Sequence, residues 1–173
     1  MISEITSIED IVQLATDGFA GWKQYGEVTA RERGSLLIFN YTPKAQYEGR
    51  WNFFERVSRG LIIDKDTGEI VARPFDKFYN WGEDGRTSSG KIVSVTEKID
   101  GSMGELYREN GAYRIATRGS LESDQALWAT TFLTRNYNLD GLSNAYTLLF
   151  EIIYPENKIV VNCVTQLSDF HSL

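Results

Sequence analysis

The amino-terminal region of the chain has apolar residues at helical spacing. Ser7 and Asp10 occupy the first and fourth positions of a capping box, in which each side chain can bond the other residue's backbone amide. The apolar residues around them share one face of a helix: Ile8, Ile11, Val12 and Ala15. We therefore predict a short amphipathic helix capped by Ser7.

Strand patterns dominate from residue 35 onwards. The run SLLIFNY (35–41) is rich in apolar and aromatic residues, and GLIIDKDTGEIVARPF (60–75) reads as two strands around a polar turn containing Gly68. The run KIVSVTEKI (91–99) alternates apolar and polar residues, which is typical of a strand with one buried face.

The carboxyl-terminal half predicts a hairpin, a helix and two more strands. The segment 103–118 is centred on Asn110-Gly111, the preferred two-residue hairpin turn. Ser120 opens a helix candidate that runs to residue 135, and AYTLLFEIIY (145–154) and NKIVVNC (157–163) read as strands. Many antiparallel strands with one or two helices indicate an α+β fold, and 173 residues suit a single domain spanning 1–173.

Composition narrows the range of functions. Cys163 is the lone cysteine and His171 the lone histidine, so no intramolecular disulfide is expected and zinc ligands are scarce. The net charge of −6 argues against a sequence-independent coat on nucleic acid, although a local basic patch is compatible with it. No apolar run reaches the roughly 20 residues of a membrane span, and the acidic amino terminus is no signal peptide. We expect a soluble cytoplasmic protein without a membrane partner.

The stretch EKIDGSMG (97–104) is the first candidate for chemistry. Lys98 is either a surface charge beside a hairpin or a nucleophile. On a strand, Lys98 and Asp100 would project from the same face, and Gly101 and Gly104 would let the backbone approach a ligand. A nucleophilic lysine must lose its proton, although its free pKa is about 10.4. Because Asp100 favours the protonated form, a metal ion or basic groups would have to outweigh it.

Four charged residues elsewhere occupy conspicuous positions. Arg59 precedes a buried strand, Lys77 lies between aromatic residues, Arg118 follows a strand, and Glu151 is embedded in an apolar run. A buried carboxylate needs a partner, which here is either a ribose hydroxyl of a ligand or a core arginine. Arg59 and Arg118 are either phosphate ligands or ordinary charges at strand ends.

Together these segments resemble the RNA ligase 1 family of ATP-dependent ligases, within the covalent nucleotidyltransferase superfamily. The matching segments follow the family's order: SRGLIID (58–64), ARPFDKFYNWGE (72–83), EKIDGSMG (97–104), TRGS (117–120) and FEIIYPENKIVV (150–161). The resemblance implies an antiparallel-sheet-rich adenylyltransferase domain, with residues 1–57 as a lead-in segment and residues 58–163 as the motif-bearing core.

The resemblance also implies a reaction. Lys98 would attack the α-phosphate of ATP and carry AMP as a lysyl-AMP phosphoramidate, with magnesium or manganese helping pyrophosphate to leave. The adenylate would pass to an RNA 5′-phosphate, and an RNA 3′-hydroxyl would displace AMP, as in RNA repair. Glu151 would bind the ribose. The full set of implied nucleotide-binding positions is Arg59, Lys77, Glu97, Ile99, Asp100, Gly101, Arg118 and Glu151. No metal ligand is assigned.

The sequence departs from the family after residue 163. Neither the E-G-x-V motif, whose glutamate is associated with the metal, nor the closing K-x-K motif follows. We therefore expect the front part of a ligase domain, and if a carboxyl-terminal segment is missing, supplying it should restore activity. Alone the chain should bind ATP weakly, form lysyl-AMP slowly or undetectably, and seal no RNA. Three alternatives stay open: a catalytically dead nucleotide- or RNA-binding module, a DNA ligase or mRNA-capping type of nucleotidyltransferase, and a structural α+β domain with accidental motif matches.

Overall fold

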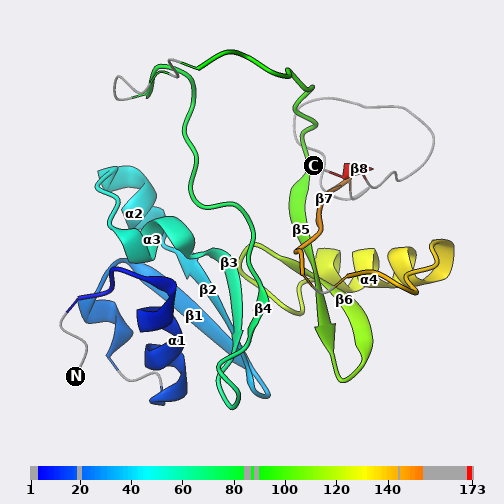
Figure 1. Cartoon of the computed structure of the whole chain (residues 1–173), viewed down its shortest axis with the longest axis horizontal. Coiled ribbons are helices and arrows are strands. Elements are labelled where there is room, and N and C mark those ends of the chain that lie inside the picture. Colours follow the sequence, from blue (N-terminus) through cyan, green and yellow to red (C-terminus); the bar gives the residue numbers. More distant parts are fainter. Residues whose placement is uncertain are drawn as a thin grey trace.

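Two antiparallel sheets form the framework of the protein. The structure, a computed structural model, describes residues 4–18, 21–83, 87, 90–143, 145–153 and 171–172. Within these residues the first sheet has the order β1-β2-β3-β4 and the second has the order β6-β5-β7-β8 (Figure 1). The predicted α+β class is confirmed.

The first sheet is built from short strands that follow one another along the chain. Its members are β1 (Val28–Arg33), β2 (Leu36–Tyr41), β3 (Arg59–Asp64) and β4 (Ile70–Ala72). The helices α1 (Ile8–Thr16), α2 (Pro43–Glu48) and α3 (Phe53–Val57) and the 3-10 turn η1 (Trp22–Gln24) lie on the same side of the molecule (Figure 1). The predicted capping box of α1 is present, because Ser7 and Asp10 bond each other's backbone amides.

The second sheet carries the longest helix. The hairpin of β5 (Ser102–Glu109) and β6 (Ala112–Thr117) pairs through β5 with β7 (Leu149–Ile152), which in turn pairs with β8 (His171–Ser172). The helix α4 (Asp124–Asn136) packs on this sheet, and its residues Ala129 and Leu133 share a buried cluster with Ile115 and Ile152.

A buried layer joins the two sheets. Leu36, Ile38, Ile62 and Ala72 of the first sheet pack against Tyr107 and Ala116 of the second, with Leu121 completing the cluster. A separate cluster beneath α1 and α3 includes Ile11, Phe39, Phe54 and Leu61. Because β2 and β3 contribute side chains to both clusters, they are buried on both faces.

The described parts of the connection between β4 and β5, residues 73–83 and 90–101, form an arch above the space between the two sheets (Figure 1). The strand predicted over 91–99 lies in this arch, and that prediction is wrong, because the segment pairs with no other described strand. Ile92, Val93 and Val95 are 70%, 92% and 86% exposed. A segment with alternating apolar and polar residues forms a strand when its apolar face is buried. In the described part of the chain, nothing covers the apolar face of residues 91–99.

Most of the other elements predicted from the sequence are present, and the start of one helix differs. The hairpins at 60–75 and 103–118 and the strands within 35–41 and 145–154 are confirmed. The predicted helix start at Ser120 is wrong: α4 begins at Asp124 with Ser123 as its N-cap, because Ser120 instead pairs with Thr117 in a tight turn. The strand predicted at 157–163 lies outside the described residues.

Five of the described elements were not predicted: η1, β1, α2, α3 and β8. The helices α2 and α3 follow local signals that a search for apolar periodicity passes over, namely Thr42 and Pro43 at the start of α2 and the Asn52–Glu55 capping box of α3. In the described part of the chain, none of the helices has the length and apolar character that crossing a membrane requires.

Candidate functional site

A cavity of about 1280 Å³ lies between the two sheets and beneath the arch. Its walls come from β2, β3, the arch, β5, the turn after β6, α4 and β7. Eight residues that the sequence nominated line it: Arg59, Lys77, Glu97, Lys98, Ile99, Gly101, Arg118 and Glu151. Asp100 is not among the lining residues, although its carboxylate contacts Lys98. Five separate stretches of sequence therefore meet in one cavity.

Lys98 reaches this cavity from the carboxyl-terminal end of the arch. Its side chain is 80% exposed, and its Nζ lies 2.7 Å from Oδ1 of Asp100. The two side chains meet as predicted, but they do so on extended, unpaired backbone rather than on a strand. The hydrogen bond and charge of Asp100, with a smaller contribution from Glu151, raise the pKa of Lys98. In this structure Lys98 is therefore a protonated ammonium.

Glu151 lies on β7, directly opposite Met103 of β5. Its Oε1 accepts a hydrogen bond of 2.8 Å from the backbone amide of Gly101. Burial raises the pKa of Glu151, and the Gly101 amide and Lys98 oppose that rise. The alternative interpretation, an ion pair with a core arginine, is not observed for Glu151 among the described residues, where its direct partner is a main-chain amide.

Gly101 is required by the close approach of β5 and β7. A Cβ at this position would lie 2.5 Å from the backbone oxygen of Ile152 and 3.1 Å from Cγ of Glu151. Any larger residue would push Glu151 away from the chain that carries Lys98. The glycine of the K-x-D-G motif thus keeps the nucleophile candidate and the carboxylate close together.

Arg59 and Arg118 form a cationic wall. The guanidinium of Arg59 lies over the ring of Phe78 at 4.6 Å, and its Nη1 lies 3.3 Å from the sulfur of Met103. Burial lowers the pKa of Arg59, and the nearby charge of Arg118 acts in the same direction. Arg118 donates a 3.1 Å hydrogen bond to the hydroxyl of Tyr41. Two cations held side by side favour a polyanionic ligand.

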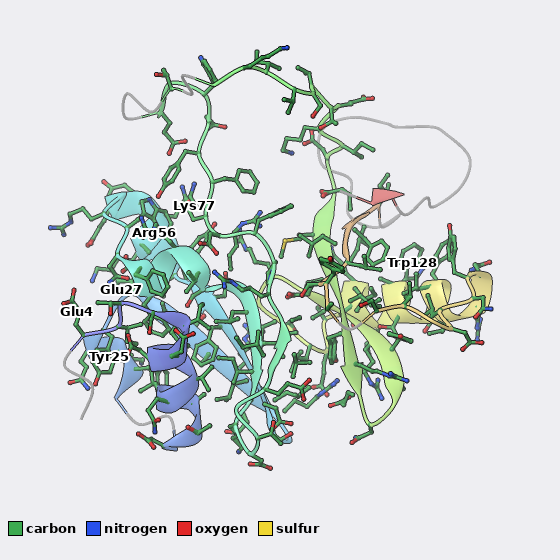
Figure 2. All side chains as sticks on the ribbon, in the orientation of Figure 1. Glu4, Tyr25, Glu27, Arg56, Lys77 and Trp128 are labelled. Atoms are coloured by element: carbon green, nitrogen blue, oxygen red, sulfur yellow. The ribbon has the colours of Figure 1, made fainter. Side chains whose placement is uncertain are left out.

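Lys77 lies between two aromatic rings at the base of the arch. Its Nζ is 5.3 Å from the ring centre of Trp51 and 4.3 Å from that of Tyr79. The Lys77 backbone amide donates a 2.8 Å hydrogen bond to the Arg56 carbonyl. Figure 2 labels Lys77 next to Arg56 of α3, with Trp128 far away on α4. Lys77 therefore reaches the cavity from the side of the first sheet.

Glu105, on β5, is fully buried close to Arg59, and sequence reasoning did not single it out. Both carboxylate oxygens lack a hydrogen-bond partner, and burial raises the pKa of Glu105 well above its ordinary value despite the attraction of Arg59. A Cβ at Gly60 would lie 2.5 Å from Oε1 of Glu105, so this glycine makes room for the carboxyl group.

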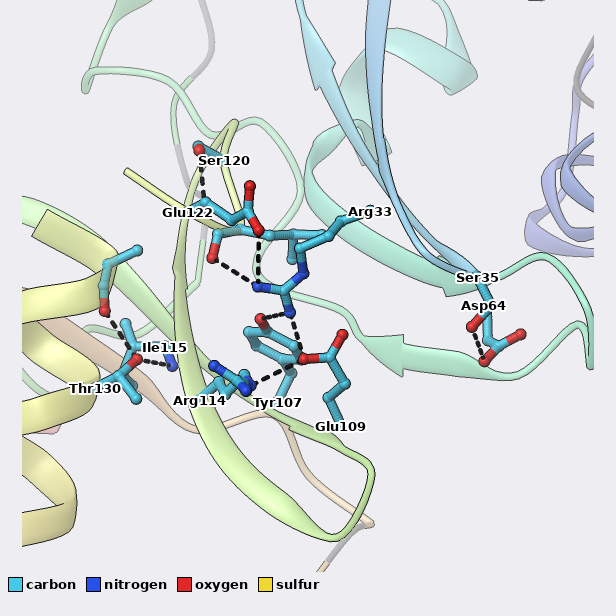
Figure 3. A network of polar contacts seen from close by, with 12 residues as sticks. Arg33, Ser35, Asp64, Tyr107, Glu109, Arg114, Ile115, Ser120, Glu122 and Thr130 are labelled. Atoms are coloured by element: carbon cyan, nitrogen blue, oxygen red, sulfur yellow. Dashed lines mark hydrogen bonds and ion pairs between the residues drawn. The ribbon is translucent and has the colours of Figure 1, made fainter. Parts of the chain in front are cut away.

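A polar network joins the two sheets away from the cavity (Figure 3). From the end of β1, Nη2 of Arg33 contacts Oε2 of Glu109 at 2.5 Å and the hydroxyl of Tyr107 at 2.6 Å. The other guanidinium nitrogen lies 3.6 Å from Glu122. These contacts help to fix the spacing of the sheets and thereby the width of the cavity.

The carboxylates near Lys98 form no metal cage of their own. In the described part of the chain, His, Cys, Asp and Glu side chains make no group of three that could hold an ion. Magnesium binds through one or two carboxylates together with substrate phosphates and water. Asp100 and Glu151 fit that limited role, so the donor set suits an ion that arrives bound to a polyphosphate.

Comparison with known proteins identifies the family. A family model described as RNA ligase matches residues 57–167, which include every candidate residue of the cavity. A protein named "Putative RNA ligase" from Thermovibrio ammonificans is 32% identical over 121 residues, covering 65% of this chain and 32% of its own length. The RNA ligase of Rhodothermus phage RM378 is 24% identical over 178 residues, covering 78% and 40% respectively. RNA ligase 1 of bacteriophage TS2126 is 27% identical over 122 residues, covering 61% and 31%. The chain thus spans less than half the length of these curated relatives.

Proposed function

Because the chain belongs to the RNA ligase family, we propose that it is the ATP-binding, self-adenylylating part of an RNA ligase with Lys98 as the nucleophile. The observation that supports this proposal most strongly is the cavity, which brings Lys98 together with Arg59, Lys77, Arg118 and Glu151. The family match supports an RNA ligase, and the ATP dependence, the activity and the residue roles are our proposal.

The proposed reaction begins with ATP in the cavity. Nζ of Lys98 attacks the α-phosphorus and forms a P–N bond, while the bond to the bridging oxygen breaks and that oxygen keeps the electron pair as pyrophosphate leaves. Lys98 gives up two of its three ammonium protons to solvent, one before the attack and one as the P–N bond forms, which leaves a neutral nitrogen on the anionic phosphoramidate. Arg59, Lys77 and Arg118 stabilise charge on the phosphates, and Glu151 accepts a hydrogen bond from the ribose. When bound, magnesium would contribute charge neutralisation on the triphosphate.

The protonation of Lys98 is the main barrier to this step. Asp100 raises the pKa of Lys98, so the ammonium form predominates at neutral pH. An ammonium has no lone pair and cannot attack phosphorus. Lys98 therefore becomes a nucleophile when the pH rises toward its pKa, when Asp100 moves away from it or when additional positive charge approaches. The reaction should be slow in the arrangement described here.

Two subsequent steps complete ligation in the proposal. An oxygen of an RNA 5′-phosphate attacks the phosphorus of lysyl-AMP and releases Lys98. An RNA 3′-hydroxyl then attacks that 5′-phosphate and releases AMP. RNA ends carrying a 5′-phosphate and a 3′-hydroxyl are thus the proposed partners. The single-domain organisation and the cytoplasmic location stay predictions.

Radiolabelled nucleotides separate this function from its alternatives. We expect α-³²P-ATP with magnesium to label the chain covalently, and denaturing electrophoresis to retain the label. Labelling by GTP instead would indicate capping-type chemistry. Binding of ATP without a covalent label under any pH condition would indicate a nucleotide-binding module that has lost catalysis.

A further inference from the structure

Trp51 contacts Lys77, which lines the cavity. Trp51 itself lies outside residues 57–167, the stretch that matches the RNA ligase model. It follows the end of α2 and is partly buried. Its ring faces Nζ of Lys77 at 5.3 Å, while Tyr79 faces the same nitrogen from another side at 4.3 Å. Trp51 and Tyr79 themselves meet edge to face, with ring centres 6.4 Å apart. The ammonium of Lys77 therefore lies against two rings and also donates a hydrogen bond to the backbone carbonyl of Phe78.

Trp51 also connects Lys77 to Arg118. Its ring meets the buried ring of Tyr41 at 4.9 Å and 82°. Tyr41 in turn supports Arg118, whose guanidinium lies 5.1 Å from the Tyr41 ring and donates a hydrogen bond to its hydroxyl. Trp51 thus contacts the ammonium of Lys77 directly but reaches Arg118 only through Tyr41, whose hydrogen bond to Arg118 does not depend on the Trp51 ring.

A cation held by aromatic rings differs from a cation held in an ion pair, because no neighbouring anion neutralises its charge. An aromatic face attracts a cation through its quadrupole but does not cancel the cation's charge. Among the described residues, neither Lys77 nor Arg118 forms an ion pair with a carboxylate. Both charges are held in place and remain available to an incoming anion. A lysine side chain that is already ordered also loses less rotamer freedom when it binds.

We propose that Trp51 is a positioning residue that holds Lys77 for the β- and γ-phosphates of ATP. This inference rests on the proposed nucleotide site. It gives Trp51 a defined effect: the ammonium of Lys77 favours a triphosphate over a monophosphate, because AMP lacks the groups that Lys77 would contact. Loss of the Trp51 ring removes one of the contacts that restrict the Lys77 side chain and leaves Tyr79 and the Phe78 carbonyl in place, without removing the charge or altering the adenosine contacts.

The test compares binding of two nucleotides by the whole chain. Dissociation constants for magnesium-ATP and for AMP are measured by calorimetry for the wild type, Trp51→Leu and Trp51→Phe. We expect Trp51→Leu to weaken ATP binding about three- to tenfold, the range of one cation–π contact, and to leave AMP binding within about twofold. Trp51→Phe retains a ring and should recover most of the ATP affinity. Trp128→Leu, on the distant helix α4, is the matched control and should change neither constant.

Two further variants keep the test decisive if Trp51→Leu does not fold or if it acts through a residue other than Lys77. Tyr79→Leu removes the other ring and should show the same selective loss of ATP affinity, so it carries the test if Trp51→Leu does not fold. In a Lys77→Met background, Trp51→Leu should have no further effect on ATP binding. Equal weakening of ATP and AMP, or additive effects of the Trp51 and Lys77 substitutions, would overturn the inference. A wild type that binds neither nucleotide would overturn the proposed site itself.

Discussion

Glu105, fully buried beside Arg59 of the cavity, offers the sharpest test of the electrostatics next to the cavity. Its carboxyl group is fully buried, both oxygens lack a hydrogen-bond partner, and burial raises its pKa well above the ordinary value of 4.5. The folded protein therefore keeps a proton on Glu105 at pH values where the unfolded chain has lost it. We predict that Glu105→Gln, which has nearly the same shape and no titration, removes a pH dependence of stability.

The size of this pH dependence follows from the difference in proton binding between the folded and the unfolded state. Below pH 4.5 the carboxyl group is protonated in both states, and Glu105→Gln should change the free energy of unfolding by less than about 1 kcal/mol, since the two side chains bury similar polar groups. Between 4.5 and the raised pKa, only the folded state holds the proton. There the wild type loses about 1.4 kcal/mol of stability per pH unit relative to the variant, until the pH passes the raised value.

The assay is urea unfolding monitored by tryptophan fluorescence, at half-unit pH steps from 4 to 8. Subtracting the variant's free energy of unfolding from that of the wild type at each pH cancels all other titrating groups. The difference should fall steadily as the pH rises above 4.5. A difference that stays constant with pH, or that rises with pH, would refute the conclusion that Glu105 is neutral in the folded protein.

Two other substitutions test the architecture around the cavity. Gly60→Ala places a Cβ 2.5 Å from Oε1 of Glu105 at a φ of +112°. It should reduce the free energy of unfolding by about 2–4 kcal/mol, against about 1 kcal/mol for Gly34→Ala, where the φ is also positive but no atom lies within 4 Å. Equal losses in a denaturant titration would contradict the predicted clash. Arg33→Met removes the contact between the sheets and should reduce that free energy by about 2 kcal/mol. Arg31→Met, at an exposed position two residues earlier on the same strand, should have little effect, and an equal effect of the two would show that the network adds nothing.

Local chemistry made part of the fold predictable. The β5–β6 turn needs positive φ at both central residues, and Asn110 and Gly111 adopt 49° and 81°. The Ser7 capping box likewise depends only on residues three positions apart. The segment 91–99 failed because its alternating pattern specifies a face to be buried but not the partner that buries it. The start of α4 failed because Ser120 and Ser123 are both suitable caps, and only the Thr117–Ser120 turn decides between them.

The candidate site, like the fold, could be predicted only in part. Lys98, Arg59 and Glu151 could be nominated because charged residues in apolar surroundings, and the family's motif order, mark them. Trp51 and Tyr41 could not, because an aromatic residue in sequence reads as core. Glu105 was missed because its burial depends on Gly60 in the other sheet, a long-range contact that no local pattern encodes.

The central claim, that Lys98 is the nucleophile, is tested most directly by mapping the adenylylated residue. The chain is incubated with α-³²P-ATP and magnesium for hours at pH 7, 8 and 9, and labelled peptides are identified by mass spectrometry. Because Asp100 raises the pKa of Lys98, labelling should be slow and should rise about tenfold per pH unit as the free amine becomes available. The label should lie on Lys98, vanish in Lys98→Ala and persist in Lys91→Ala. A label that survives in Lys98→Ala, or no label even at pH 9, would contradict the account.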